Sequence, residues 1–257
     1  MSKALKPAVS LRQSLQTRVG LLVCSAVLLM GLGALLFGLK PMVERIAADQ
    51  FSVASAQVEA KLNSVFQPAE QILRMSPGWI GSEPPDLKNP AVFNHLFQPV
   101  LGALPEATSI VAGTSSGEGW LLLQLPDGKW RNRMTDRQRW GDRHHFFEWD
   151  ANGNAQDYWK SVDYDPRKRA WYSSAMLDTK SVQWTEPYTF FTTGDPGITA
   201  STRIAMKDGR DFVIGMDLML RDLSSLTMNT KLGTHGIALV LTEDLRVLAL
   251  PAAPSGI

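Results

Sequence analysis

The chain has 257 residues and a formal charge of +1, a length that suits one large domain or one and a half ordinary ones. Apolar residues make up 44% of the sequence, so a hydrophobic core is expected. The near-neutral charge argues against nucleic acid as a partner, because phosphate binding needs a concentrated basic face. The single cysteine, Cys24, excludes a disulfide framework within the chain.

Residues 19–39 form an uninterrupted apolar run (VGLLVCSAVLLMGLGALLFGL) without a charged residue. At 1.5 Å per residue, a helix of this length crosses the hydrocarbon core of a bilayer, so we predict a transmembrane helix. Residues 1–18 carry four cations and no acidic residue, which places this segment in the cytoplasm and the sequence after residue 40 outside. A cleaved secretory signal and a buried soluble helix are the alternatives. The run is longer than a signal peptide's apolar region of about 7–15 residues.

Residues 40–75 are predicted to form a stalk helix, in which Pro41 suits the first turn and Pro68 should introduce a kink. Apolar or small residues recur every three or four positions and make one stripe along this helix. The stripe comprises Phe51, Ala54, Val58, Leu62, Val65, Ala69 and Ile72. Such a stripe indicates packing on a domain, on a second stalk, or on both, and an ordinary core helix has the same pattern.

The next part of the chain changes from helices to strands. Residues 76–89 are rich in Pro and Gly and predict a loop, and residues 91–104 predict a second helix. Strand-length apolar runs then alternate with the turns PDGK, DANGN and KDGRD, which predicts a sheet of about five antiparallel strands. Helices before and between the strands make the fold class α+β.

The end of the sequence predicts the beginning of a second module. A short helix is expected to continue to about Lys231, followed by the strands GIALVL and RVLALP on either side of the turn TEDL. Because an isolated two-stranded hairpin is unstable, we expect residues 232–257 to open a module that continues beyond this sequence. Residues 76–231 then form the first module.

Catalytic signatures are missing from the sequence. It has no Gly-rich phosphate loop and no Gly-x-Ser-x-Gly turn. His144 and His145 are neighbours on an expected strand, so they point to opposite faces and cannot ligate one metal. We therefore expect no enzyme activity, metal or cofactor in this region.

The stretch YDPRKRAWY (residues 164–172) concentrates aromatic and cationic side chains at a strand-to-helix junction. Asp165 is placed to cap a helix that has Pro166 at its first position and runs over residues 167–176. Arg169 and Tyr172 are three residues apart and should share a face of that helix. The forked donors of Arg169 suit a carboxylate, although a capped helix with a core Trp and a surface Arg explains the stretch equally well.

Asp217 stands in the middle of an apolar strand, FVIGMDLML, where an unpartnered carboxylate is costly. Strand alternation places it on the same face as Val213 and Gly215. If that face also carries the tyrosines, one site has Asp217 for an ammonium group and Arg169 for a carboxylate.

At this point the sequence resembles the double Cache (dCache) sensor domains of bacterial transmembrane receptors. The resemblance rests on YDPRKRAWY, WTEPY, TTGDPGITAS and FVIGMDLMLRDLSSL, in that order. It implies two PAS-like modules outside the inner membrane. In a subset of the family that binds amino acids, the matching positions are Tyr164, Arg169, Trp171, Tyr172, Tyr188 and Asp217. Arg169 and Trp171 would hold the ligand carboxylate, while the tyrosines and Asp217 would take the ammonium. Ala170 and Phe190 depart from the subset, which often has proline and an acidic residue there.

The function implied by this resemblance is periplasmic sensing of an amino acid or related small zwitterion. The signal would pass through the stalk helix, in a homodimer, to a cytoplasmic output domain that this sequence lacks. Chemotaxis, histidine kinase and cyclase domains all occur in that place, and we slightly favour a nucleotide cyclase. The alternative is a ligand-free structural or dimerisation module of a membrane signalling protein or adhesion scaffold, with a filled core near Arg169.

Overall fold

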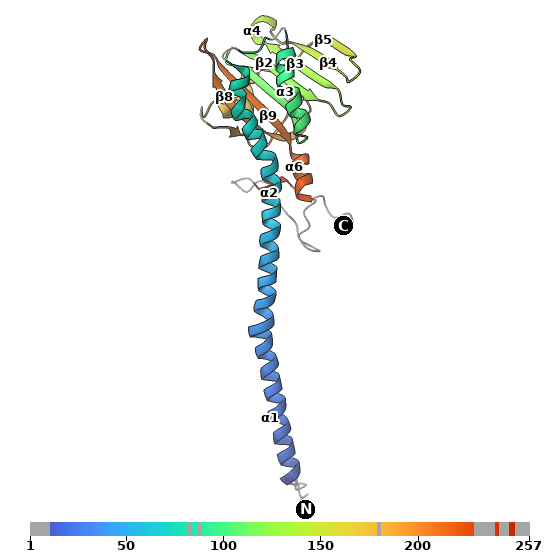
Figure 1. Ribbon diagram of the computed structural model, residues 1–257, viewed down its shortest axis with the longest axis vertical. Helices are drawn as coiled ribbons and strands as arrows, with labels where there is room; N and C mark the ends of the chain where they lie inside the picture. The colour runs from blue at the N-terminus through green and yellow to red at the C-terminus, as the bar shows by residue number, and fades with distance from the viewer. Residues whose placement is uncertain are drawn as a thin grey trace, which may run out of the picture. The chain divides into compact units, whose positions relative to one another are not determined.

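The computed structural model describes residues 11–81, 84–86, 89–178, 181–228, 240–241 and 247–249 (Figure 1). The chain divides into two compact units, residues 1–55 and residues 56–257.

The first unit is helical wherever it is described. It contains α1 (Leu11–Gly33), the π-helical segment η1 (Ala34–Leu39) and the beginning of α2 (Lys40–Ile80). The large apolar side chains of this unit are exposed, as for Leu28, Met30 and Phe37. In the described part of the chain, one helical stretch is long and apolar enough to cross a membrane, and it includes the predicted span of residues 19–39. Residues 1–10, which carry two of the four N-terminal cations, lie outside the described part.

The second unit is built on a nine-stranded antiparallel sheet with the strand order β5-β4-β3-β2-β1-β9-β8-β6, in which β7 also pairs with β8. The strands are β1 (Ala107–Thr114), β2 (Glu118–Gln124), β3 (Trp130–Asp136), β4 (Arg143–Trp149), β5 (Ala155–Ser161), β6 (Gln183–Trp184), β7 (Tyr188–Thr189), β8 (Pro196–Ala205) and β9 (Asp211–Met219). The α+β class is confirmed, but the expectation of about five strands was too low. Strand β3 lacks an apolar run, and β6 and β7 have two residues each, so none of the three gave a strand signal.

One face of the sheet carries the main hydrophobic core. Along β9, the alternate residues Phe212, Ile214, Met216 and Leu218 are fully buried and belong to this core. The predicted second helix is confirmed as α3 (Ala91–Ala103), which packs against β1 and β2 and lies across the sheet in Figure 1. Burial of these side chains against α2 and α3 is the main stabilising contribution to the unit.

A specific contact joins the far edge of the sheet to α2. The Trp184 indole Nε1 of β6 donates a hydrogen bond to Glu70 Oε1 at 3.0 Å. The same indole packs edge-on against Phe66, with 4.9 Å between ring centroids. Helix α2 ends at Ile80, so the prediction of a loop from residue 76 was wrong. The Ser76 hydroxyl, which is buried, donates to the Leu73 carbonyl within this last part of the helix.

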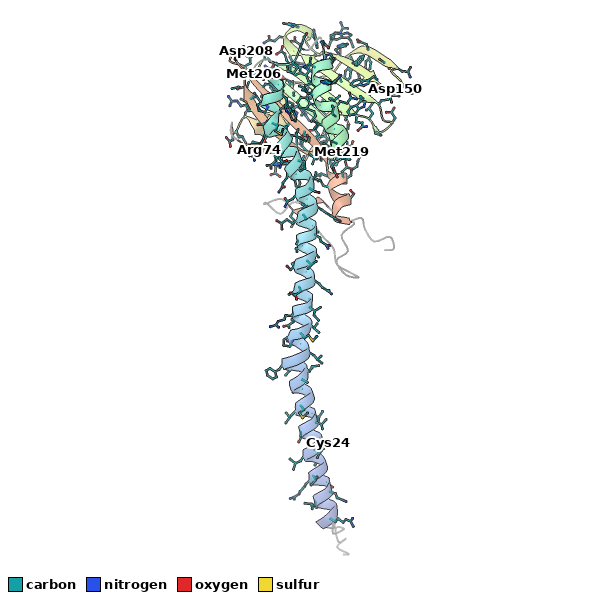
Figure 2. The ribbon with its side chains drawn as sticks, viewed as in Figure 1. Cys24, Arg74, Asp150, Met206, Asp208 and Met219 are labelled. Atoms are coloured by element: carbon teal, nitrogen blue, oxygen red, sulfur yellow. The ribbon has the colours of Figure 1, made fainter. Side chains whose placement is uncertain are left out.

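The opposite face of the sheet is covered by the short helices η2 (Pro166–Lys168) and α5 (Ala170–Ala175). The long hairpins extend beyond this covered area, and Figure 2 labels Asp150 and Asp208 at the tips of β4–β5 and β8–β9. As predicted from alternation, His144 is buried and bonds to Thr135, whereas His145 lies on the other face of β4 and pairs with Asp157.

The end of the described chain contains α6 (Leu220–Met228) and an antiparallel pair, β10 (Val240–Leu241) and β11 (Val247–Ala249). These strands lie within the predicted hairpin of the second module. The remaining parts of that hairpin, residues 232–239, 242–246 and 250–257, lie outside the described residues.

Candidate functional site

The site begins with the turn formed by the YDP sequence. The Asp165 carboxylate caps the turn as predicted and accepts a hydrogen bond from the Arg167 amide at 3.0 Å. Pro166 packs directly on the backbone of β1, because a Cβ at Gly113 would lie 2.7 Å from the Pro166 Cβ. The missing side chain of Gly113 therefore allows the turn to lie flat on the sheet, which fixes the position of the following residues.

Arg169 interrupts the helix that was expected over residues 167–176. Its backbone is extended (φ −92°, ψ 147°), with η2 before it and α5 after it. Arg169 and Tyr172 consequently do not share a helix face, contrary to the prediction. The Arg169 side chain lines a cavity, whereas Tyr172 is buried in an apolar cluster with Val111 and Val213.

The cavity lies between this turn, the sheet and the segment after β7, and its volume is about 20 Å³. It is lined by Thr108, Ser109, Val111, Leu121, Leu123, Arg133, Tyr164, Arg169, Trp171, Tyr188, Phe190, Phe191, Thr192, Thr193 and Asp217. Five of the six residues selected from the sequence are therefore brought together, and Tyr172 is the one that does not line the cavity. A cavity of this volume has room for about one water molecule.

Asp217 supplies the carboxylate of the cavity from the middle of β9, and its side chain is almost fully buried. It accepts hydrogen bonds from the Ser109 hydroxyl at 2.5 Å and from the Thr199 hydroxyl at 2.6 Å. Burial raises the pKa of Asp217 to about 6, although the two hydroxyl donors act in the opposite direction. Since the Thr199 proton points to Asp217, the Tyr188 hydroxyl must donate to the Thr199 oxygen, 2.6 Å away.

Two guanidinium groups face the cavity, Arg133 from β3 and Arg169 from the turn. Arg133 is only 3% exposed, and its guanidinium carbon lies 3.7 Å from the centre of the Tyr164 ring. Its Nη1 donates to the Thr192 hydroxyl at 2.9 Å, while its buried Nε has no hydrogen-bond partner in the described part of the chain. Burial lowers the pKa of Arg133, and the nearby positive charge of Arg169 acts in the same direction.

Sequence reasoning missed Arg133. Strand β3 has the sequence WRNRMTD. Strand alternation places Arg133 on the opposite face from its neighbours Asn132 and Met134, but it does not identify which face meets the cavity. Its pairing partner is Leu121 of β2, which faces the cavity. This cross-strand pairing is the signal that identifies the residue, and it becomes available only once the register of the sheet is known.

Aromatic side chains from the segment after β7 close the cavity. Phe190 is buried, and its ring occupies the space beside Gly197, where a Cβ would come within 2.0 Å of the ring. Phe191 faces both cations, with its centroid 5.4 Å from the Arg133 guanidinium carbon and 5.5 Å from that of Arg169. Phe190 thus provides an apolar wall where the resemblance leads one to expect an acidic residue.

Comparison with known sequences gives two kinds of relative. Residues 134–225 match the family model described as the first PDC sensor domain of methyl-accepting chemotaxis protein-like receptors. The chemotaxis protein TlpB of Bacillus subtilis is 33% identical over 93 residues, which are 36% of this chain and 14% of TlpB. Adenylate cyclase 1 of Rhizobium meliloti is 24% identical over 263 residues, covering 93% of this chain and 38% of the cyclase. The chain thus matches well under half the length of each of these relatives.

Solved structures show the same fold. The ligand-binding domain of the Campylobacter jejuni chemoreceptor Tlp3, in complex with L-valine, superimposes with a TM-score of 0.58 at 15% identity, over 86% of this chain and 79% of that one. The corresponding domain of Pseudomonas fluorescens CtaA, in complex with L-isoleucine, gives 0.55 at 18% identity, over 84% and 73%. Residues 134–225 are therefore similar to a chemoreceptor PDC sensor domain, and the second unit has the fold of these chemoreceptor ligand-binding domains.

Proposed function

We propose that this chain is the sensing region of a membrane-anchored receptor, and that its cavity binds an amino acid or a related small zwitterion. The observation that carries the proposal is the placement of Asp217 and Arg169 in one buried cavity. A guanidinium group can bind the carboxylate of a ligand, and a buried carboxylate can bind its ammonium. The ligands named for the structural relatives, L-valine and L-isoleucine, belong to the same chemical class and support the proposal.

We assign the roles of the site residues from the family resemblance, and the presence of five of them in the cavity supports this assignment. Arg169 and the Trp171 ring receive the ligand carboxylate, and Asp217 receives the ammonium group with Tyr164 and Tyr188. Tyr172, the sixth residue selected from the sequence, supports Trp171 through an edge-on ring contact with 5.7 Å between centroids.

Ligand entry requires the closing segment to move. The cavity of about 20 Å³ holds a water molecule and cannot hold an amino acid. Phe191 and Thr193 of this segment are exposed and lie outside the strands, so we expect the segment to move while the sheet stays folded. Binding therefore selects an open arrangement of this segment, and the ligand's differential affinity drives the signal.

The receptor context follows from the first unit and the relatives. We propose a bacterial inner-membrane protein with a cytoplasmic N-terminus and a periplasmic sensor, as the positive charges before the apolar helix favour. The earlier part of the α2 stripe, Phe51 to Leu62, would join two copies and carry the signal to an output domain, since Val65 and Ala69 are buried in the core of the second unit. Similarity to the Rhizobium meliloti cyclase extends over nearly the whole chain, whereas the chemotaxis match covers about a third, which favours a nucleotide cyclase output.

A second candidate function is a ligand-free structural or dimerisation module. The closed volume of the cavity favours it, because Arg133 and the aromatic rings already occupy most of the space.

Thermal unfolding of the full chain in detergent, with and without amino acids, distinguishes the two functions. A ligand that binds only the folded state raises the melting temperature in proportion to RT ln(1 + [L]/Kd). The shift should disappear in Arg169→Ala and Asp217→Ala, and persist in Arg203→Ala, whose cation pairs with Asp211 outside the cavity. If no amino acid shifts the melting temperature of the unsubstituted chain, the second candidate function, a ligand-free module, is supported and amino-acid binding is wrong.

A further inference from the structure

The cavity contains one more positive charge than a simple zwitterion can neutralise. Among its lining residues, the charged groups are two guanidiniums, Arg133 and Arg169, and one carboxylate, Asp217. A neutral amino acid places its carboxylate on one guanidinium and its ammonium on Asp217. The second guanidinium would then remain buried without an anion, an arrangement that is strongly unfavourable.

Arg133 lacks the anionic partner that Arg131 and Arg203 of the same sheet have. Arg131, two residues earlier on β3, pairs with Glu148 at 2.7 Å, and Arg203 pairs with Asp211 at 2.8 Å. Within the described part of the chain, Arg133 forms no salt bridge, although it is the more deeply buried of these three cations. It contacts the Tyr164 and Phe191 rings and donates to the Thr192 hydroxyl, and its Nε is unsatisfied within these residues.

The two guanidinium groups also lie close enough to serve one small molecule. Both face the Tyr164 ring, with their central carbons 3.7 Å and 6.0 Å from its centroid. Both also face Phe191 at nearly equal distances. A ligand that displaces Phe191 therefore meets both guanidinium groups.

We propose that Arg133 forms a second anion subsite in the cavity, and that the ligand is an amino acid with an acidic side chain, such as L-glutamate or L-aspartate. This inference rests on the proposed function, since it keeps Arg169 and Asp217 for the α-carboxylate and ammonium. The side-chain carboxylate of the ligand binds the Arg133 guanidinium, including the unsatisfied Nε, in a forked arrangement. The occupied cavity then holds three positive and three negative groups, which form three pairs and leave no buried cation over.

Isothermal titration of the full chain in detergent with matched ligand pairs tests the subsite. L-Glutamate should bind at least about 30-fold more tightly than L-glutamine, because the amide leaves a buried charged group unpaired. The same difference is expected between L-aspartate and L-asparagine. In Arg133→Gln the preference for the acid should be lost, while Arg131→Gln, which removes a cation from the same strand outside the cavity, should retain it.

The outcomes separate this inference from the proposed function. If glutamine or valine binds as tightly as glutamate, the acidic subsite is wrong and amino-acid sensing stands. If glutarate, which lacks the ammonium group, binds as tightly as glutamate, the role of Asp217 in the proposed function is wrong and so is an amino-acid ligand. If none of these compounds binds, both are wrong. The wild-type ratio of glutamate to glutamine affinity decides the matter even if Arg133→Gln fails to fold.

Discussion

Replacing Asp217 with asparagine should stabilise the ligand-free protein. The carboxylate is 5% exposed and forms no salt bridge within the described part of the chain; its hydrogen bonds come from two neutral hydroxyls. Its pKa rises from 3.8 to about 6 in the folded state, so the ionised form opposes folding. At 1.36 kcal/mol per pKa unit, this opposition is worth up to about 3 kcal/mol at pH 7. Asparagine has nearly the same shape and can still bond to both hydroxyls, which rotate to suit an amide.

The pH dependence of this effect follows from the direction of the pKa shift. The unfavourable contribution of Asp217 is fully present above about pH 6 and disappears below pH 3.8, where the carboxyl is protonated in both states. For a domain of this size, about 3 kcal/mol corresponds to an increase in melting temperature of roughly 6–12 °C at pH 7. At pH 5 the difference between variant and wild type should shrink to about half.

Thermal melts of the full chain, followed by tryptophan fluorescence at pH 7 and pH 5, measure this difference. Asp211→Asn is the matched control, since Asp211 is paired with Arg203 and its loss should leave the melting temperature unchanged or lower. The reasoning about Asp217 is refuted if Asp217→Asn melts at or below the wild-type temperature at pH 7. It is also refuted if the gain is the same size at both pH values.

Three further outcomes are expected. Amino-acid affinity measured by titration calorimetry should fall between pH 7 and pH 5, because protonation of Asp217 removes the anion that faces the ligand ammonium; equal affinities would contradict this. Gly197→Ala should lower the melting temperature by several degrees, since its Cβ would lie 2.0 Å from the Phe190 ring and 2.7 Å from the Leu218 carbonyl oxygen; an unchanged melting temperature would contradict this. Trp184→Phe removes the hydrogen bond to Glu70 and should cost about 1 kcal/mol, whereas an unchanged melting temperature would show that the contact contributes nothing.

The parts of the site that were predictable from the sequence are those determined by neighbouring residues. The cap at Asp165 requires only a short polar side chain followed by proline, and the structure has it. The face occupied by Asp217 follows from strand alternation, and Val213 of the same strand is buried on the same side. The resemblance to a known family added the connection between these segments.

The parts that were not predictable depend on residues distant in sequence. Arg133 lies on the cavity face because β3 pairs with β2 in a particular register, which the polar sequence of β3 does not specify. The extended backbone of Arg169 accompanies the packing of Pro166 on Gly113, 53 positions earlier in the chain, and helical spacing therefore failed there. Two-residue strands such as β6 are too short to produce a periodic pattern.

The Trp184–Glu70 contact attaches α2 to the sheet close to the candidate site. Trp184 pairs with Ala200 of β8, and the preceding residue, Thr199, holds both Asp217 and Tyr188 through its hydroxyl. Thr199, which contacts the proposed ligand residues, and Ala200, which pairs with the anchor of α2, are thus joined by one peptide bond. Under the proposed function, a ligand that displaces Tyr188 or Asp217 would shift β8 at the position where Trp184 attaches α2 to the sheet.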